Sequence, residues 1–258
     1  MKTISIFNQK GGVGKTTAAI NLSAALASQG KKILIVDLDP QGNTTSGLGI
    51  DKRDQLLSTN DLLLGETVIS EIIQPIEKVP GLHLIPSTIH LAGADVELTR
   101  YERPQTRLAE RLNAIESSLF DFIFLDCPPS LGMLSTNALT ASNSVIIPMQ
   151  SEFYALEGIG QLQDTINRIK QGLNKDLEIE GVLLSMYDPR KNLHLQVAQE
   201  LKKYFGALVY QTTIPQNVRL AEAPSFGVPV FLYDPTCKGA QAFQDLALEF
   251  LKHNEEKP

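Results

Sequence analysis

The chain has 258 residues, of which 43% are hydrophobic and 20% charged, and its mean hydropathy is close to zero at −0.05. This composition excludes a disordered, fibrous or disulfide-stapled protein and fits one large α/β domain or two small domains. Lys and Arg total 23 against 29 Asp and Glu, so the net charge of −6 excludes a generally basic nucleic-acid coat but permits a local basic patch.

Short runs that are apolar throughout, rather than alternating, predict buried parallel strands. In chain order they cover residues 4–7, 33–36, 82–85, 122–125, 145–147 and 182–184, with 209–214 as a weaker seventh. Helical spacing between them predicts helices over residues 15–29, 104–118, 158–172, 193–205 and 239–252, and the leucine and isoleucine clusters in residues 51–80 suggest short helices. Alternating strands and helices predict one α/β domain over residues 1–258, with a mostly parallel twisted sheet, helices on both faces and a polar tail at 253–258.

Residues 10–17 read Lys-Gly-Gly-Val-Gly-Lys-Thr-Thr and lie between the first predicted strand and the first predicted helix. A phosphate-binding loop needs this context, because glycines let the backbone approach a phosphate and the helix N-terminus favours its charge. We expect Lys15 to reach the β- and γ-phosphates and Thr16 to bind Mg²⁺. The standard pattern requires glycine at position 9, where this chain has Gln9 and then Lys10.

Acidic side chains follow two of the predicted strands at their carboxyl ends, where ligands gather in open α/β sheets. Asp126 has the form of a carboxylate that holds Mg²⁺ directly or through a bound water. Asp37 and Asp39 lie two apart, so on an extended strand they would face the same side, and one could reach a γ-phosphate or its attacking water. Residues 174–177 read Asn-Lys-Asp-Leu and lack the final Asp of a guanine reader, which favours ATP over GTP.

Residues 10–16 resemble the deviant Walker A box of the ParA/MinD ATPases, whose mark is a lysine before the glycine pair. Residues 36–43 and 126–132 resemble the two switch segments of the ParA branch, and further matches occur at 148–152, 154–158, 214–225 and 232–235. The resemblance runs from Ile4 to about Leu251 and is closest to the chromosomal ParA (Soj) type. It implies a single-domain P-loop NTPase fold.

The resemblance also implies roles for individual residues. Lys10 would cross to the phosphates of a partner subunit in an ATP sandwich homodimer, and Asp39 would position the attacking water, with Lys15 and Asp126 also catalytic. Asp37 would join Thr16 and Asp126 in supporting the metal. The implied nucleotide-binding residues are Lys10, Gly11, Gly12, Val13, Gly14, Lys15, Thr16, Thr17, Met186, Pro215 and Asn217.

Members of this family bind double-stranded DNA without sequence preference as ATP-bound dimers, and a ParB-type partner releases them by stimulating hydrolysis. The resemblance therefore implies an Mg²⁺-dependent ATPase that partitions chromosome or plasmid DNA in the cytoplasm, in association with the nucleoid. Arg190 and Arg219 match the family's DNA contacts. Lys202 and Lys203 could widen that patch, whereas the row Arg100, Arg103, Arg107 and Arg111 is better explained as a solvated helix face.

Three alternatives remain for comparison. A MinD-like ATPase acting on a membrane or protein scaffold would need a basic amphipathic C-terminal helix, but the predicted last helix carries Asp245 and Glu249, so we expect no membrane contact. An iron–sulfur reductase would need a cysteine pair, but Cys127 and Cys237 lie far apart in the chain and fit packing in a reducing cytosol. A sequence-specific transcription factor would need a helix-turn-helix, for which the short stretch before the first predicted strand leaves no room.

We expect neither a secretory signal nor a membrane span, because no apolar run approaches roughly 20 residues.

Overall fold

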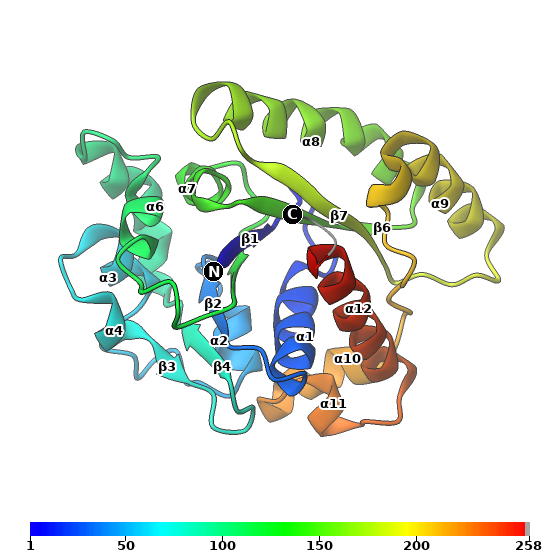
Figure 1. Ribbon diagram of the computed structural model, residues 1–258, viewed down its shortest axis with the longest axis horizontal. Coiled ribbons are helices and arrows are strands. Elements are labelled where there is room, and N and C mark those ends of the chain that lie inside the picture. The colour runs from blue at the N-terminus through cyan, green and yellow to red at the C-terminus, as the bar shows by residue number, and fades with distance from the viewer. Residues whose placement is uncertain (256–258) are drawn as a thin grey trace.

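A computed structural model describes residues 1–255, apart from the side chains of residues 153–157. The described residues form a central seven-stranded sheet in the order β3-β4-β2-β5-β1-β6-β7 (Figure 1). Neighbouring strands pair in parallel, except for the antiparallel pair of β3 and β4 at one edge. The strands are β1 (Lys2–Ile6), β2 (Ile33–Asp37), β3 (Gln74–Pro75), β4 (Leu82–Ile85), β5 (Phe122–Asp126), β6 (Ser144–Gln150) and β7 (Glu178–Ser185).

Helices cover both faces of this sheet (Figure 1). The longer ones are α1 (Lys15–Ser28), α7 (Met133–Ala141), α8 (Phe153–Gly172), α9 (Asn192–Phe205) and α12 (Lys238–Glu255). The short ones are α2 (Asn43–Gly47), α3 (Thr59–Leu64), α4 (Ile69–Ile72), α5 (Ala94–Glu97), α6 (Arg107–Leu112), α10 (Val218–Glu222) and α11 (Val230–Tyr233), together with the 3₁₀ turns η1 (Ile89–Gly93), η2 (Leu98–Arg100), η3 (Gly206–Leu208) and η4 (Ala223–Phe226).

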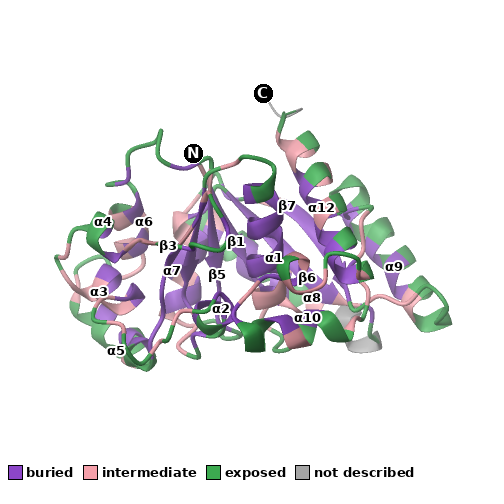
Figure 2. Cartoon of the chain, turned by 90° about the horizontal axis from the view of Figure 1, so that it is seen from below, coloured by how far each residue is buried: buried purple, intermediate pink, exposed green. Residues whose placement is uncertain are grey.

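Two hydrophobic cores lie on opposite faces of the sheet, because successive side chains of a strand point to opposite faces. In β2, Leu34 and Val36 join the core under α3, α6, α7, α8 and α9, whereas Ile33 and Ile35 join the core under α1 and α12. The central strands are buried along most of their length, the short edge strand β3 is not, and the helices expose their outer faces (Figure 2). This double burial explains why the strands read as continuous apolar runs in the sequence.

Six of the predicted strands are confirmed within a few residues, and the α/β fold with a mostly parallel sheet is confirmed with them. The weaker prediction over 209–214 is wrong. One isolated bridge, at Val209, occurs in this range. Tyr210 N and Ile214 N donate to carbonyls of β7, but the N–H groups of Gln211 and Thr212 between them donate to the Glu249 carboxylate at 2.7 and 2.9 Å, so no continuous strand forms. The two-residue edge strand β3 was not predicted.

The helices differ from prediction mainly at their ends. The segment predicted as a helix over 104–118 is helical only in α6. At its start, the Asn137 side chain accepts from Leu108 N and donates to Pro104 O, so a side chain satisfies these backbone groups instead of a preceding helical turn. The last helix continues to Glu255, so residues 253–255 of the predicted polar tail are helical, and the rest of that tail lies outside the described residues.

The apolar face of α12 packs into the core beside α1, through side chains such as Phe243, Leu246 and Phe250. A helix that buries this face in its own domain offers no free apolar face to lipid. Among residues 1–255, no helix is both long and apolar enough to cross a bilayer.

Candidate functional site

The glycine-rich loop between β1 and α1 turns its carbonyl groups away from a cavity. Ser185 Oγ donates to Val13 O at 2.7 Å, Gln150 Nε2 donates to Gly12 O at 2.8 Å, and Lys15 Nζ donates to Lys10 O at 3.0 Å. Positive φ angles at Gly12 (74°) and Gly14 (91°) allow this path, which side chains other than glycine rarely follow.

The amide groups of the same loop remain available. The first backbone bond of α1 runs from Ala18 N to Gly14 O, and no residue in the described part of the chain accepts from the N–H groups of residues 11–16. Unpaired amides at a helix N-terminus form an anion site, because they combine hydrogen-bond donors with the positive end of the helix dipole. The loop is therefore arranged to hold phosphate.

The cavity in front of this loop has a volume of about 340 Å³. It brings together the predicted loop residues other than Lys10 and the buried Val13, and the predicted acid Asp39. Its lining consists of Gly11, Gly12, Gly14, Lys15, Thr16, Thr17, Asp39, Gln41, Asn43, Pro129 and Met186. Lys15 is only 7% exposed, and this burial lowers its pKa, an effect that the nearby Asp126 carboxylate opposes. A buried ammonium with so little counter-charge is suited to gain stabilisation from a phosphate.

Asp126 ends β5, is fully buried and contacts Thr16, which lines this cavity. Its Oδ2 accepts hydrogen bonds from Thr16 Oγ1 at 2.9 Å and Thr44 Oγ1 at 2.7 Å, whereas its Oδ1 has no partner among the described residues. Burial raises the pKa of this carboxyl to about 6. An unpartnered buried carboxylate oxygen beside a threonine hydroxyl fits Mg²⁺, which takes one or two protein oxygens together with phosphate oxygens and waters.

Asp37 lies beside Asp126 in the paired strands β2 and β5 but does not share its surroundings. Its Oδ2 accepts from both N and Oγ1 of Thr45, at 2.9 and 2.7 Å, and its Oδ1 accepts from Asp39 N at 3.2 Å. Burial and the charge of Asp126 raise its pKa to about 7. Both oxygens are thus engaged and make Asp37 an anchor for the segment that follows β2, while its predicted contact to a metal stays a prediction.

Asp39 itself lies beyond the end of β2 and lines the cavity. Its Oδ1 accepts from Gln41 N at 2.9 Å, and no contact of Oδ2 is recorded in the described part of the chain. The inference that Asp37 and Asp39 face the same side fails because the strand ends at Asp37 and the chain turns. The two acids therefore have separate functions.

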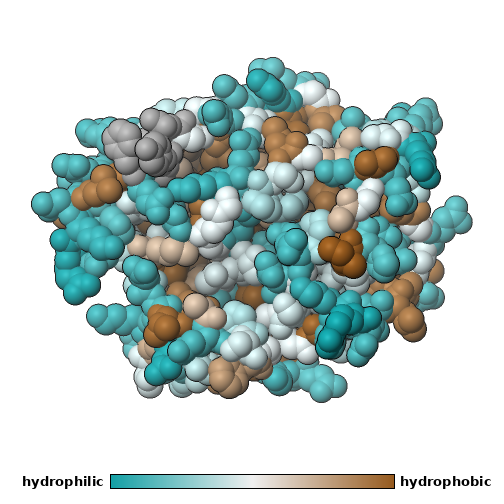
Figure 3. Space-filling view, turned by 180° about the vertical axis from the view of Figure 1, so that it is seen from behind, coloured by the Kyte–Doolittle hydropathy of each residue, from teal (hydrophilic) through white to brown (hydrophobic). Residues whose placement is uncertain are grey.

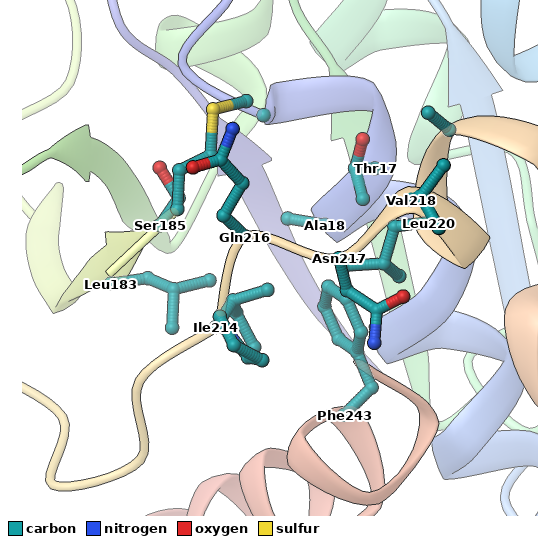
Figure 4. Close-up of a pocket in the computed structure, with 14 residues that line it drawn as sticks. Thr17, Ala18, Leu183, Ser185, Ile214, Gln216, Asn217, Val218, Leu220 and Phe243 are labelled. Atoms are coloured by element: carbon teal, nitrogen blue, oxygen red, sulfur yellow. The ribbon is translucent and has the colours of Figure 1, made fainter. Parts of the chain in front are cut away.

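A second, mostly apolar pocket of about 510 Å³ adjoins the phosphate cavity and shares Gly14, Thr17 and Met186 with it. Figure 4 shows Leu183, Ile214, Leu220 and Phe243 around this pocket, with Thr17 and Ala18 contributed by α1. The predicted residues Met186, Pro215 and Asn217 all line it. Asn217 Oδ1 caps α10 by accepting from Arg219 N at 2.8 Å, which leaves the amide NH₂ to donate. Pocket and cavity together have the shape of a nucleoside triphosphate site.

Lys10 does not line the phosphate cavity of its own chain. Its side chain is 41% exposed, and its ammonium pairs with Glu152 at 2.6 Å on the outer side of the loop. Within one subunit, therefore, the structure separates Lys10 from the other loop residues that the sequence predicts to bind phosphate.

The two predicted DNA contacts lie on neighbouring segments. Tyr187 N donates to Ile214 O at 2.9 Å, and Tyr187 bridges to Pro215, so the loop that carries Arg190 runs beside the segment that leads to Arg219. Both guanidinium groups have acidic neighbours: Asp188 holds Arg190 at 2.9 Å, and Glu222 and Asp234 hold Arg219 at 2.8 and 3.4 Å. The exposed side chain of Lys203 pairs with Glu200 in α9.

The row of four arginines is not uniformly solvated, which corrects the sequence-based interpretation. Arg100 and Arg103 are exposed, but Arg107 donates to Leu63 O and lies over the Tyr101 ring, and Arg111 donates to Thr67 O. Arg107 and Arg111 therefore fasten α6 to the α3–α4 segment.

The two cysteines belong to opposite faces of the sheet. Cys127 is buried in the core under α7 and α8, and Cys237 packs against the core under α1 and α12. Burial also raises the pKa of the Cys127 thiol, which disfavours the thiolate. No group of three or more His, Cys, Asp or Glu side chains able to hold a metal ion occurs in the described residues. These observations support the interpretation of both cysteines as packing residues.

The sequence did not predict three residues that hold Asp126 and the phosphate loop in place. Thr44 contacts Asp126, and Ser185 and Gln150 tie the carbonyls of the loop. Ser185 is the last residue of β7 and Gln150 is the last residue of β6, so both lie at the same edge of the sheet as the phosphate loop. This position at the carboxyl ends of the strands is the feature by which they could have been predicted.

Comparison with known proteins gives consistent matches. The family model described as an AAA domain matches residues 1–179. The chain is 54% identical to the sporulation initiation inhibitor protein Soj of Bacillus subtilis, over 96% of this chain and 97% of that protein. It is 46% identical to the chromosome partitioning protein ParA of Caulobacter vibrioides, over 100% of this chain and 96% of that protein.

Solved structures agree with these matches. A cobyrinic acid a,c-diamide synthase from Mycobacterium smegmatis, with bound ATP analogue and magnesium, superposes with a TM-score of 0.86 at 34% identity, covering 100% of this chain and 97% of that one. The cell division ATPase MinD of Pyrococcus furiosus superposes with a TM-score of 0.80 at 28% identity, covering 97% and 98% of the two chains.

Proposed function

The chain belongs to the Soj/ParA family of partitioning ATPases, and from that premise we propose that its ATP-bound sandwich dimer binds DNA without sequence preference and is released when a ParB-type partner stimulates hydrolysis. One observation carries this proposal. One cavity is lined by the unpaired loop amides, the buried Lys15 ammonium and Thr16, and it adjoins an apolar pocket for the base. Thr16 donates to the Asp126 carboxylate, whose other oxygen has no partner among the described residues.

The loop amides and Lys15 bind the β- and γ-phosphates of ATP, and the base lies among the apolar side chains of the adjoining pocket. Thr16 and Asp126 hold Mg²⁺, which neutralises charge on the phosphates when bound. Pro215 offers no N–H on the pocket wall, and the Asn217 amide can donate to a ring nitrogen of the base.

Asp39 is the residue that orients the attacking water, because its carboxylate lines the phosphate cavity and is held by Gln41 N on one oxygen only. The other oxygen can accept a hydrogen bond from water and direct its lone pair towards the γ-phosphorus. Asp37 contributes indirectly by holding the Asp39 main chain.

Dimerisation accounts for the position of Lys10. Its ammonium lies outside the cavity of its own subunit, and the Glu152 pair that holds it is exposed and therefore weak, typically below about 1 kcal/mol. A second subunit facing the cavity can take up this ammonium at its own phosphates. Exposed apolar side chains beside the cavity support such a contact, because Ile89 lies in a groove with Pro40 and Gln41, and Leu131 follows Pro129 of the cavity wall.

DNA binding rests on the segments next to the base pocket. Arg190 and Arg219 lie on adjoining segments that continue from pocket residues Met186 and Asn217, so a nucleotide that orders the pocket also orders the arginines. The surface seen from behind in Figure 3 is mostly hydrophilic, with hydrophobic residues in separate small groups. A patch built from two subunits reconciles DNA binding with a net charge of −6.

The catalytic part of this proposal is tested by measuring phosphate release and binding of a fluorescent ATP analogue for Lys15→Ala. We expect at least about a 100-fold loss of turnover, together with loss of binding, because the buried cation is a charge-assisted phosphate contact. Lys32→Ala, at an exposed position away from the cavity, is the matched control and should behave as wild type. Turnover by Lys15→Ala at the wild-type rate would contradict the assignment.

A further inference from the structure

We propose that Ser87 is a positioning residue for ATP hydrolysis, which holds the main chain at Asp39 so that the Asp39 carboxylate faces the phosphate cavity. This inference rests on the proposed role of Asp39 in orienting water. Ser87 lies in none of the motifs that carry the family resemblance, and no charge or aromatic group draws attention to it in the sequence.

The position of Ser87 follows from the sheet. Strands β2 and β4 pair in parallel with Val36 opposite Ile85, so the residues that follow the two strands leave the same edge side by side. Ser87 is fully buried between them, and its Oγ donates to Asp39 O at 2.7 Å.

Ser87 is itself fixed by a second contact. Its N–H donates to Thr45 Oγ1 at 2.8 Å, and that hydroxyl donates to Asp37 Oδ2 at 2.7 Å. Asp37 in turn accepts from Asp39 N at 3.2 Å. These contacts form a closed ring through Ser87, Thr45, Asp37 and Asp39. Ser87 and Asp37, which are fully buried, hold the peptide groups on the two sides of Asp39.

The other contacts of the Asp39 turn are local, apart from one in which Lys52 Nζ donates to Gln41 O. Gly42 N donates to Asp39 O at 2.8 Å and Gln41 N donates to Asp39 Oδ1 at 2.9 Å, which are local turn contacts that would move with the segment. Ser87 Oγ supplies the only hydrogen bond in the described chain that joins Asp39 O to another strand end. Removing this hydroxyl should let the turn shift as a unit while the phosphate loop stays in place.

A shift of about 1 Å at a catalytic group can lower turnover by about 100-fold without altering substrate binding. The Ser87→Ala variant keeps the Ser87 N–H and the Asp37 contacts, so we expect a smaller loss, of about tenfold in kcat. The affinity for the fluorescent ATP analogue should stay within about twofold, because no contact of Ser87 touches the phosphate loop.

The experiment measures kcat, affinity for the ATP analogue and the thermal midpoint for wild type, Ser87→Ala, Ser87→Thr and Ser142→Ala. Ser142 is the matched control, because it is a buried serine whose Oγ contacts Ala138 O and Ser5 Oγ, and it precedes β6 at the amino ends of the strands, away from the phosphate cavity. Ser87→Thr keeps a hydroxyl and should restore most of the lost turnover, and Ser142→Ala should leave kcat unchanged.

The outcomes separate this inference from the proposed function. If wild type hydrolyses ATP and Ser87→Ala has the same kcat, the inference fails and the ATPase assignment stands. If kcat, affinity and thermal midpoint of Ser87→Ala fall together, and Ser87→Thr rescues none of them, Ser87 has a purely structural role and the inference also fails. If wild type does not hydrolyse ATP, the proposed function fails first.

Discussion

Replacing Asp126 by Asn should stabilise the nucleotide-free protein while abolishing its response to Mg²⁺. The carboxyl of Asp126 is fully buried, and burial raises its pKa from 3.8 to about 6. A carboxyl whose pKa is higher in the folded state binds more protons there than in the unfolded state, so stability falls as pH rises through this interval. A pKa shift of about two units lowers the free energy of unfolding by about 3 kcal/mol, at roughly 1.4 kcal/mol per unit. This full loss applies at pH 8, where the carboxyl is ionised in both states.

The neutral amide of Asp126→Asn escapes this penalty, and its carbonyl can still accept from the hydroxyls of Thr16 and Thr44. Removing the Asp126 charge also lowers the pKa of Asp37, because that charge contributes to raising it in wild type. Loss of the Asp126 penalty and the lower Asp37 pKa therefore both increase the free energy of unfolding at pH 8. Urea unfolding without metal or nucleotide should show a gain of up to about 3 kcal/mol at pH 8, which shrinks towards zero near pH 4.

Asp176→Asn, at an exposed position, serves as the control and should change stability little at either pH. Addition of Mg²⁺ to protein that already holds ATP should stabilise wild type further at pH 8 and leave Asp126→Asn nearly unaffected, because the variant lacks the carboxylate that holds the metal. A variant less stable than wild type at pH 8, or a gain that does not depend on pH, would refute the reasoning.

Two further predictions follow from the proposed cycle. Asp39→Ala should bind ATP and accumulate as a dimer in sedimentation experiments, since only the water-orienting carboxylate is lost, and a species that stays monomeric with ATP would contradict this role. Arg190→Glu and Arg219→Glu should each weaken binding to a random DNA duplex and lower the salt slope by about one, with dimerisation unchanged. Arg53→Glu is their matched control, because Arg53 pairs with Asp51 as Arg190 pairs with Asp188, and equal DNA affinity of all three variants would disprove the patch.

Much of the fold could be predicted because the central strands are buried on both faces and therefore read as apolar runs. Helix α7 was not predicted, because some of the residues that it buries are polar. Asn137 is fully buried there beside apolar residues of the helix, accepts from Leu108 N and donates to Pro104 O, so the buried face is mixed rather than apolar throughout.

The phosphate loop could be predicted because its glycines, lysine and threonine are contiguous in sequence. The residues that hold it could not, since Ser185 and Gln150 reach it from strands that are remote in sequence. The roles of Asp37 and Asp39 depend on where β2 ends, a boundary that hydrophobic pattern does not define to one residue.

Nucleotide-dependent DNA binding tests the central claim most directly. Fluorescence anisotropy of a labelled random-sequence duplex should be measured with ATP, with ADP and without nucleotide, each at two salt concentrations. The proposed cycle predicts binding with ATP alone, and a steep loss of affinity at the higher salt concentration. Equal binding in all three nucleotide states, or no binding in any, would contradict it.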